Sequence, residues 1–272
     1  MKEFKSKVAV ITGAASGIGR AIAGHCIREG MKVVLADIEE AALAQTEQEL
    51  QAAGGTVLAV RTDVSKQNDV EVLAQKAVTT FGGVHLLVNN AGVGIDRTVW
   101  ESTIADWEWV IRVNLWSVIY GVRTFVPIML KQDTECHIVN TASIGGLISD
   151  PGMGAYKVTK HGVVTLSETL YCELAERGAK IKVSVLCPGS VNTRIIESAR
   201  NRPTELQNEP GDEEPENPKT IQAVKTGLSP QRVAEVVFQA IMNEKFYILT
   251  HPDSKPLIQQ RMESILQDRN PM

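Results

Sequence analysis

Two side chains in the segment Tyr156-Lys157-Val158-Thr159-Lys160 could act together as an acid and a base. Residues four apart on an α-helix lie on the same face, so Lys160 would stand beside Tyr156. A nearby ammonium lowers the pKa of a phenol, which is about 10 when nothing perturbs it. A tyrosine that exchanges its proton near neutral pH can serve alcohol and carbonyl chemistry. The spacing alone is common on surface helices, so its meaning depends on the rest of the chain.

A glycine-rich segment near the N-terminus could hold a phosphate group. Residues 12–19, Thr-Gly-Ala-Ala-Ser-Gly-Ile-Gly, separate a predicted strand at 7–12 from a predicted helix at 17–29. Glycines let the backbone approach a pyrophosphate, and the free N–H groups and dipole of a helix N-terminus favour its charge. The residues of this loop that we expect to contact a dinucleotide are Gly13, Ser16, Gly17, Ile18 and Gly19.

The spacing T-G-x-x-x-G-I-G, with the Tyr-Lys pair behind it, resembles the short-chain dehydrogenase/reductase family. The resemblance runs in unbroken order over about residues 5–250. It implies hydride transfer between a nicotinamide dinucleotide and the CH–OH or C=O group of a substrate. The proton-transfer set that it implies is Asn114, Ser143, Tyr156 and Lys160.

Each member of this set has a role implied by the resemblance. Tyr156 would exchange the proton with the substrate oxygen, and Ser143 would hydrogen-bond that oxygen as charge develops on it. Lys160 would lower the pKa of the tyrosine and bind the nicotinamide ribose, while Asn114 would hold a water that links Lys160 to solvent. Any one of the four could be an ordinary structural residue, but all four in order behind the glycine loop favour catalysis.

Asp37, at the end of the second predicted strand, favours NAD over NADP. A carboxylate there accepts hydrogen bonds from the adenosine ribose hydroxyls and repels a 2′-phosphate. Arg20 is a nearby cation that would argue for NADP, but it lies inside the predicted helix, where we expect it to face solvent. Further cofactor contacts implied by the resemblance, besides Tyr156 and Lys160, are Asp63, Val64, Asn90, Ala91, Gly92, Pro188, Gly189, Val191 and Thr193.

Short apolar strands alternate with helical stretches along nearly the whole chain. Runs such as 8–11, 33–36 and 86–88 are apolar throughout, as expected of parallel strands covered on both faces. This alternation predicts an α/β fold, a doubly wound parallel sheet of about seven strands in a single domain over residues 1–272.

The segment 194–228 departs from this alternation. Residues 197–219 contain seven acids and four prolines, a composition that cannot build a core. It could be a disordered insertion or a flexible lid over a substrate site, with 194–199 as its hinge helix. The lid is favoured because the segment leaves the carboxyl end of a strand, where ligands of such sheets bind.

Composition restricts the possible partners and compartment. With a net charge of −4, the protein shows no general preference for nucleic acid or for an anionic membrane. Four scattered cysteines without a C-x-x-C pair indicate reduced thiols in a cytoplasmic protein, and five histidines without ligand spacing indicate no metal site. A helix predicted over 105–130 is apolar on more than one face, so one face is available for packing on a second subunit. The family resemblance implies that this contact forms a homodimer or homotetramer.

The residues expected around the substrate are mostly apolar and suggest a hydrophobic secondary alcohol or ketone, up to the size of a hydroxysteroid. A sugar or polyol dehydrogenase would need more polar side chains, and a 3-oxoacyl carrier-protein reductase would need basic residues at the entrance. A non-catalytic NAD-sensing protein would lack the tyrosine or the lysine. The residues expected to border this pocket are Val93, Ile95, Ile144, Leu147, Met153, Ile195 and Ile196.

Replacing Tyr156 with Phe should remove nearly all turnover, because the ring stays while the exchangeable proton is lost. Cofactor binding should largely persist. Steady-state rates and a dinucleotide-binding titration on the same preparation would check this. Activity within about tenfold of the parent would contradict the assignment of Tyr156 as the acid/base.

Overall fold

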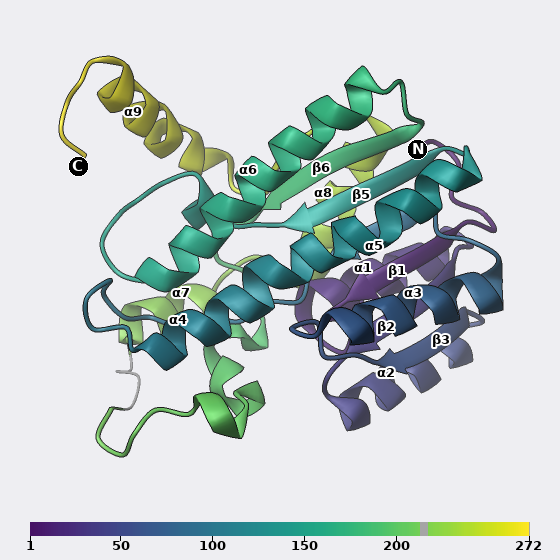
Figure 1. Ribbon diagram of the computed structural model, residues 1–272, viewed down its shortest axis with the longest axis horizontal. Helices are drawn as coiled ribbons and strands as arrows, with labels where there is room; N and C mark the ends of the chain where they lie inside the picture. Colours follow the sequence, from purple (N-terminus) through teal and green to yellow (C-terminus); the bar gives the residue numbers. More distant parts are fainter. Residues whose placement is uncertain (213–216, 272) are drawn as a thin grey trace.

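The computed structural model describes residues 1–212 and 217–271, in which seven parallel strands form one sheet. The strand order is β3-β2-β1-β4-β5-β6-β7 (Figure 1). The sheet is therefore doubly wound, as the sequence predicts. The strands are β1 (Val8–Thr12), β2 (Lys32–Asp37), β3 (Thr56–Arg61), β4 (Leu86–Asn89), β5 (Cys136–Thr141), β6 (Ile181–Cys187) and β7 (Tyr247–Leu249).

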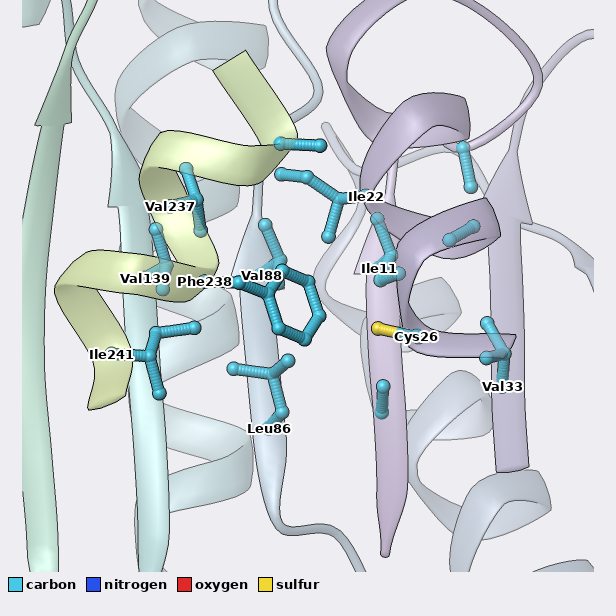
Figure 2. Close-up of a cluster of buried hydrophobic side chains, with 14 of the residues drawn as sticks. Ile11, Ile22, Cys26, Val33, Leu86, Val88, Val139, Val237, Phe238 and Ile241 are labelled. Atoms are coloured by element: carbon cyan, nitrogen blue, oxygen red, sulfur yellow. The ribbon is translucent and has the colours of Figure 1, made fainter. Parts of the chain in front are cut away.

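Helices cover both faces of the sheet because alternate residues of each strand point to opposite sides. Ala9 and Ile11 of β1 pack in a cluster with α1 and α8, whereas Val8 and Val10 pack with α3, α5 and α6. Figure 2 shows the first cluster, in which Phe238 of α8 lies over the strands. The helices are α1 (Gly17–Arg28), α2 (Glu40–Ala52), α3 (Gln67–Phe81), α4 (Ile104–Ile111), α5 (Ser117–Gln132), α6 (Gly154–Glu176), α7 (Pro218–Lys225), α8 (Pro230–Met242) and α9 (Lys255–Leu266).

The topology places the loops after β1 and β4 side by side. β1 pairs with β2 on one side and with β4 on the other, and the chain winds outward from this point in both directions. In an open parallel sheet the crevice that binds a ligand forms at the carboxyl ends of the strands where the order reverses. The glycine loop, which follows β1, lies at this position.

The helix predicted over 105–130 is interrupted. Its two parts, α4 and α5, are joined by a π-helical turn, Arg112–Trp116. The range Ile104–Gln132 is long and apolar enough to cross a membrane by length and composition alone. Val118, Phe125 and Met129 of this range are nevertheless buried in the core, as in a helix of a globular domain.

Two helices were not anticipated from the sequence. α7 lies inside the proline-rich segment, where Asn217 caps its first turn and Pro218 occupies its first position. α9 follows β7 and extends beyond the body of the sheet near the C-terminus (Figure 1). α7 has only eight residues and lies among prolines and acids, a composition typical of a loop.

Replacing Phe238 with Ala should lower the free energy of unfolding by about 3–5 kcal/mol, because the ring is 1% exposed and packs on Phe4 and His25. Leu266, 78% exposed on α9, is the matched control, and its replacement with Ala should change stability by less than about 0.5 kcal/mol. Denaturant titrations at one protein concentration would measure both. Equal effects of the two substitutions would show that the cluster around Phe238 does not dominate the core.

Candidate active site

A cleft of about 1700 Å³ runs along the carboxyl edge of the sheet. It brings together the glycine loop, Asp37 after β2 and the polar residues that follow β4, β5 and β6. Of the residues that the sequence nominates, those lining it are Gly13, Ser16, Gly17, Ile18, Asp37, Asp63, Val64, Asn90, Ala91, Gly92, Ser143, Tyr156, Lys160, Pro188, Gly189, Val191 and Thr193. Gly19 and Asn114 lie behind the lining.

The glycine loop is tightly folded against its surroundings. Gly13 has φ of +64°, a conformation that L side chains rarely adopt. A Cβ on Gly19 would lie 2.2 Å from the carbonyl oxygen of Gly13, so no other residue fits there without a shift of backbone. Close approach of backbone to a bound group is the property that the sequence predicts for this loop.

Thr12 ties the glycine loop to the loop after β4. Its hydroxyl accepts hydrogen bonds from the backbone N–H groups of Asn90 and Ala91, at 2.9 and 3.1 Å. The Asn90 side chain donates in return to the carbonyl oxygen of Thr12 at 3.0 Å. These contacts fix the two loops that flank the crevice relative to one another.

Asp37 lies at the far end of the groove from Tyr156. Its two carboxylate oxygens accept hydrogen bonds from the N–H groups of Ala15 and Glu39, at 2.9 and 3.0 Å. Burial raises the pKa of Asp37 above its ordinary value, although these two bonds oppose the rise. Arg20 is exposed and pairs with Glu49 of α2, so it faces away from the groove as predicted.

Tyr156, Ser143 and Lys160 meet at the other end of the groove. Lys160 is 3% exposed, its ammonium lies 5.5 Å from the centroid of the Tyr156 ring, and it donates to the carbonyl oxygen of Thr141 at 3.0 Å. The Ser143 hydroxyl accepts a hydrogen bond from the N–H of Gly145 at 3.1 Å. Ser143 precedes the 3₁₀ turn Ile144–Gly146 that follows β5, and this turn packs against α6, which carries Tyr156 and Lys160.

The pKa values of the pair differ from the expectation drawn from the sequence. Burial raises the pKa of Tyr156, and a hydrogen bond with Ser143 partly opposes that rise. Burial also lowers the pKa of Lys160 to about 8. Burial thus disfavours the charged form of both groups. The ammonium of Lys160 does not by itself lower the phenol pKa below its ordinary value.

Asn114 is fully buried in the π-helical turn between α4 and α5. Its side chain accepts from the N–H of Val93 at 2.8 Å and donates to the Val93 carbonyl at 2.9 Å. A Cβ on Gly92 would meet both the Asn114 oxygen and the Lys160 nitrogen, at 3.3 and 3.5 Å. Gly92 therefore lies beside both the Asn114 side-chain oxygen and the Lys160 ammonium.

The wall beyond Tyr156 is largely apolar, as predicted, with one exception. Leu147 does not line the cleft but packs against the cluster around Val163, because the short 3₁₀ turn after Ser143 directs it away. Lys157 holds the neighbouring loop by donating to the carbonyl oxygen of Gly152 at 2.9 Å and pairing with Asp150. The apolar residues that do line the wall are Val93, Ile95, Ile144, Met153, Ile195, Ile196, Ile221 and Val224.

The segment 194–228 leaves and rejoins the body at one place, since Val191 and Leu228 form a parallel bridge. Arg202 donates to the buried carboxylate of Asp106 at 2.6 Å, and its guanidinium lies over the ring of Trp109. Burial acts to raise the pKa of Asp106, but the Arg202 hydrogen bond holds it below its ordinary value. Glu213, Glu214, Pro215 and Glu216, part of the predicted lid, lie outside the described residues.

A second carboxylate holds the later part of the same segment. Asp96 accepts from the Asn217 amide at 2.9 Å and from the Thr220 hydroxyl at 2.6 Å. A third, Glu39, holds the earlier part through Arg200 at 2.6 Å. These anchors could not be predicted from the sequence, because nothing local to Glu39, Asp96 or Asp106 indicates a partner more than ninety residues away.

The chain matches known proteins over its whole length. A family model described as short chain dehydrogenase matches residues 7–204. The crystal structure of a short chain dehydrogenase/reductase from Burkholderia phymatum in complex with NAD is 49% identical, with a TM-score of 0.97, and covers 100% of this chain and 98% of that one. This chain belongs to the short-chain dehydrogenase/reductase family.

Two curated members of the family are similar along most of their length. The CLA biosynthesis dehydrogenase/reductase of Lactiplantibacillus plantarum is 37% identical over 100% of this chain and 97% of its own. The 1-deoxy-11-beta-hydroxypentalenate dehydrogenase of Streptomyces exfoliatus is 32% identical over 96% of this chain and 89% of its own. Like them, this short-chain dehydrogenase/reductase is an oxidoreductase.

The groove fits a dinucleotide on its own geometry. At Gly17 of the glycine loop the absence of a side chain leaves the backbone accessible. A Cβ added there would fill this space and lie 3.0 Å from the Thr193 side chain. Asp37 stands at one end as a hydrogen-bond acceptor, and the polar side chains of Tyr156 and Lys160 stand at the other. This short-chain dehydrogenase/reductase could thus hold the adenosine ribose at Asp37, the pyrophosphate at the glycines and the nicotinamide ribose at Lys160.

Replacing Gly19 with Ala should weaken NADH binding by about tenfold or more, because the new methyl group would displace the carbonyl of Gly13. Gly24, on the same helix, is the matched control. Its Cβ would come no closer than 3.9 Å to Leu50, so Gly24→Ala should bind NADH as the parent does. Fluorescence titration with NADH would measure both affinities. Equal affinity of the Gly19 and Gly24 variants would show that the loop does not approach the cofactor.

Proposed function

We propose that this protein is an NAD(H)-dependent dehydrogenase/reductase of hydrophobic secondary alcohols or ketones. The observation that carries the proposal is the meeting of Tyr156, Ser143 and Lys160 at one end of a groove that begins at the glycine loop. The NAD complex of the similar Burkholderia protein and the position of Asp37 both support NAD. The nicotinamide ring, when bound, supplies the hydride acceptor or donor.

The residues of the chain perform the proton transfer. Ser143 and Tyr156 both line the cleft, and each would present its hydroxyl to the substrate oxygen. Tyr156 accepts the alcohol proton during oxidation and returns it during reduction. Because burial raises the phenol pKa, the phenolate needs a second positive charge near it, and a bound nicotinamide would supply one beside the Lys160 ammonium. Asn114, which lies beside Gly92 as Lys160 does, would hold a water that links Lys160 to solvent.

The walls favour a hydrophobic substrate over a sugar or polyol. Apolar side chains from four parts of the chain surround the space beyond Tyr156, and α7 adds Ile221 and Val224 to it. The name of the similar Streptomyces enzyme describes a hydroxypentalenate as its substrate, which is consistent with this choice. Segment 194–228 serves as the lid of this space, since it supplies part of the wall and is joined to the body at both ends.

The surface and the thiols support a proposal for assembly and compartment. Trp116, at the end of the π-helical turn, is 43% exposed and stacks on Tyr120 of α5, and this exposed aromatic pair supports a contact with a second copy, in a homodimer or homotetramer. Three of the four free cysteines are buried, which supports a reducing, cytoplasmic setting.

A panel of secondary alcohols, hydroxysteroids and polyols, followed by NADH absorbance, tests the proposed function. We expect turnover of at least one bulky apolar alcohol with a kcat/KM at least about tenfold higher for NAD than for NADP, because Asp37 repels a 2′-phosphate. Polyols are the control class and should react poorly. A preference for NADP would overturn the cofactor assignment, and faster turnover of polyols would overturn the substrate class.

A further inference from the structure

The first part of the lid crosses the cofactor groove as a short strap. The strap is the 3₁₀ segment Arg194–Asn201, which Thr193 caps at its start. Thr193 lies against Gly17 of the glycine loop, where the pyrophosphate would bind. The far end of the strap reaches Glu39, two residues beyond Asp37. Both ends line the same cleft, so the strap spans the groove from the glycine loop to the adenosine end.

One carboxylate holds the far end of this strap. Oε1 of Glu39 accepts from Nε and Nη2 of Arg200 at 3.0 and 2.6 Å, and from the Asn201 amide at 3.0 Å. Oε2 lies 3.5 Å from Nη1 of Arg194. Arg200 also donates to the carbonyl oxygens of Arg194 and Glu197, at 3.0 and 2.8 Å, which closes the strap on itself. Glu39, the residue before α2, thus contacts three residues of the strap.

This anchor is more solvent-accessible than the one at Asp106. Side-chain exposure is 21% for Glu39 and 25% for Arg200, compared with 1% for Asp106 and 9% for Arg202. A partly exposed ion pair opens far more readily than a buried one, because water replaces its contacts. The anchor at Glu39 can therefore open while the buried ion pair of Arg202 with Asp106 stays closed.

We propose that Glu39 is a positioning residue that fastens the strap over the adenosine half of the cofactor, so that its ion pair with Arg200 must open before the dinucleotide can leave. This inference rests on the proposed function for the identity of the ligand. A dinucleotide lying between Asp37 and the glycine loop would have the strap on its solvent side. Release of the cofactor would then be slowed by the contacts of Glu39, because the strap must move aside first.

Stopped-flow fluorescence of NADH release from the full-length protein tests the inference. Glu39→Gln should release NADH about three- to tenfold faster, as expected for the loss of a partly exposed charged contact. Glu40→Gln is the matched control, because Glu40 is the next residue of the chain and is exposed. It should release NADH at the parental rate, within about twofold.

Arg200→Gln and the double variant distinguish a shared contact from two separate effects. Arg200→Gln should also accelerate release, and the double variant should release NADH no faster than the faster single variant, because both substitutions break one interaction. Effects that multiply in the double variant, or unchanged release in Glu39→Gln, would overturn the proposal.

Hydrogen exchange of the free protein gives a readout that needs no cofactor. Amides of 194–201 should exchange faster in Glu39→Gln than in the parent or in Glu40→Gln, while amides around Arg202 and Asp106 should be unchanged. Equal exchange in all three proteins would show that Glu39 does not fasten the strap. Failure of the parent to bind NADH would instead count against the proposed function, and the exchange result would still decide the role of Glu39.

Discussion

The geometry of the site depends on the hydrogen bonds of Thr12 with Asn90 and Ala91. They join the loops after β1 and β4, the two central strands from which the chain winds outward on either side. With these loops fixed, the glycines can only fold closely, and Gly19 lies against the carbonyl of Gly13. Gly92, beside which Asn114 and Lys160 both lie, follows the braced residues Asn90 and Ala91. The cofactor groove and the residues that we propose for proton transfer thus belong to one edge of the sheet.

Burial sets the direction of the pKa shifts of the two titratable groups at this edge of the sheet. Tyr156 and Lys160 are both taken out of water, and each is shifted toward its neutral form. A site in which neither charge is favoured responds strongly to any further charge brought into it. The positive nicotinamide is such a charge, so the acid/base couple should be poised by the cofactor and not by the protein alone.

The described part of segment 194–228, which we propose as a lid, is held by carboxylates of the body. Asp106, Asp96 and Glu39 each bind a different part of it, and the contact at Asp106 is more buried than the one at Glu39. Leu206 adds one apolar contact by packing with Trp109 and Val110. The segment is too polar to bury much apolar surface, and these contacts fix its position along the cleft.

The fold class could be predicted from the local periodicity of the chain, and the glycine loop, Asp37 and the Tyr156-Lys160 pair could be singled out from short fixed spacings. The residues expected at the pocket wall also line the cleft, except that Leu147 turns away from it. The pKa directions of Tyr156 and Lys160 could not be predicted from the sequence, since burial depends on what packs around a residue. Only the tertiary structure joined Glu39 to Arg200, 161 residues apart, because such contacts depend on the path of the whole chain.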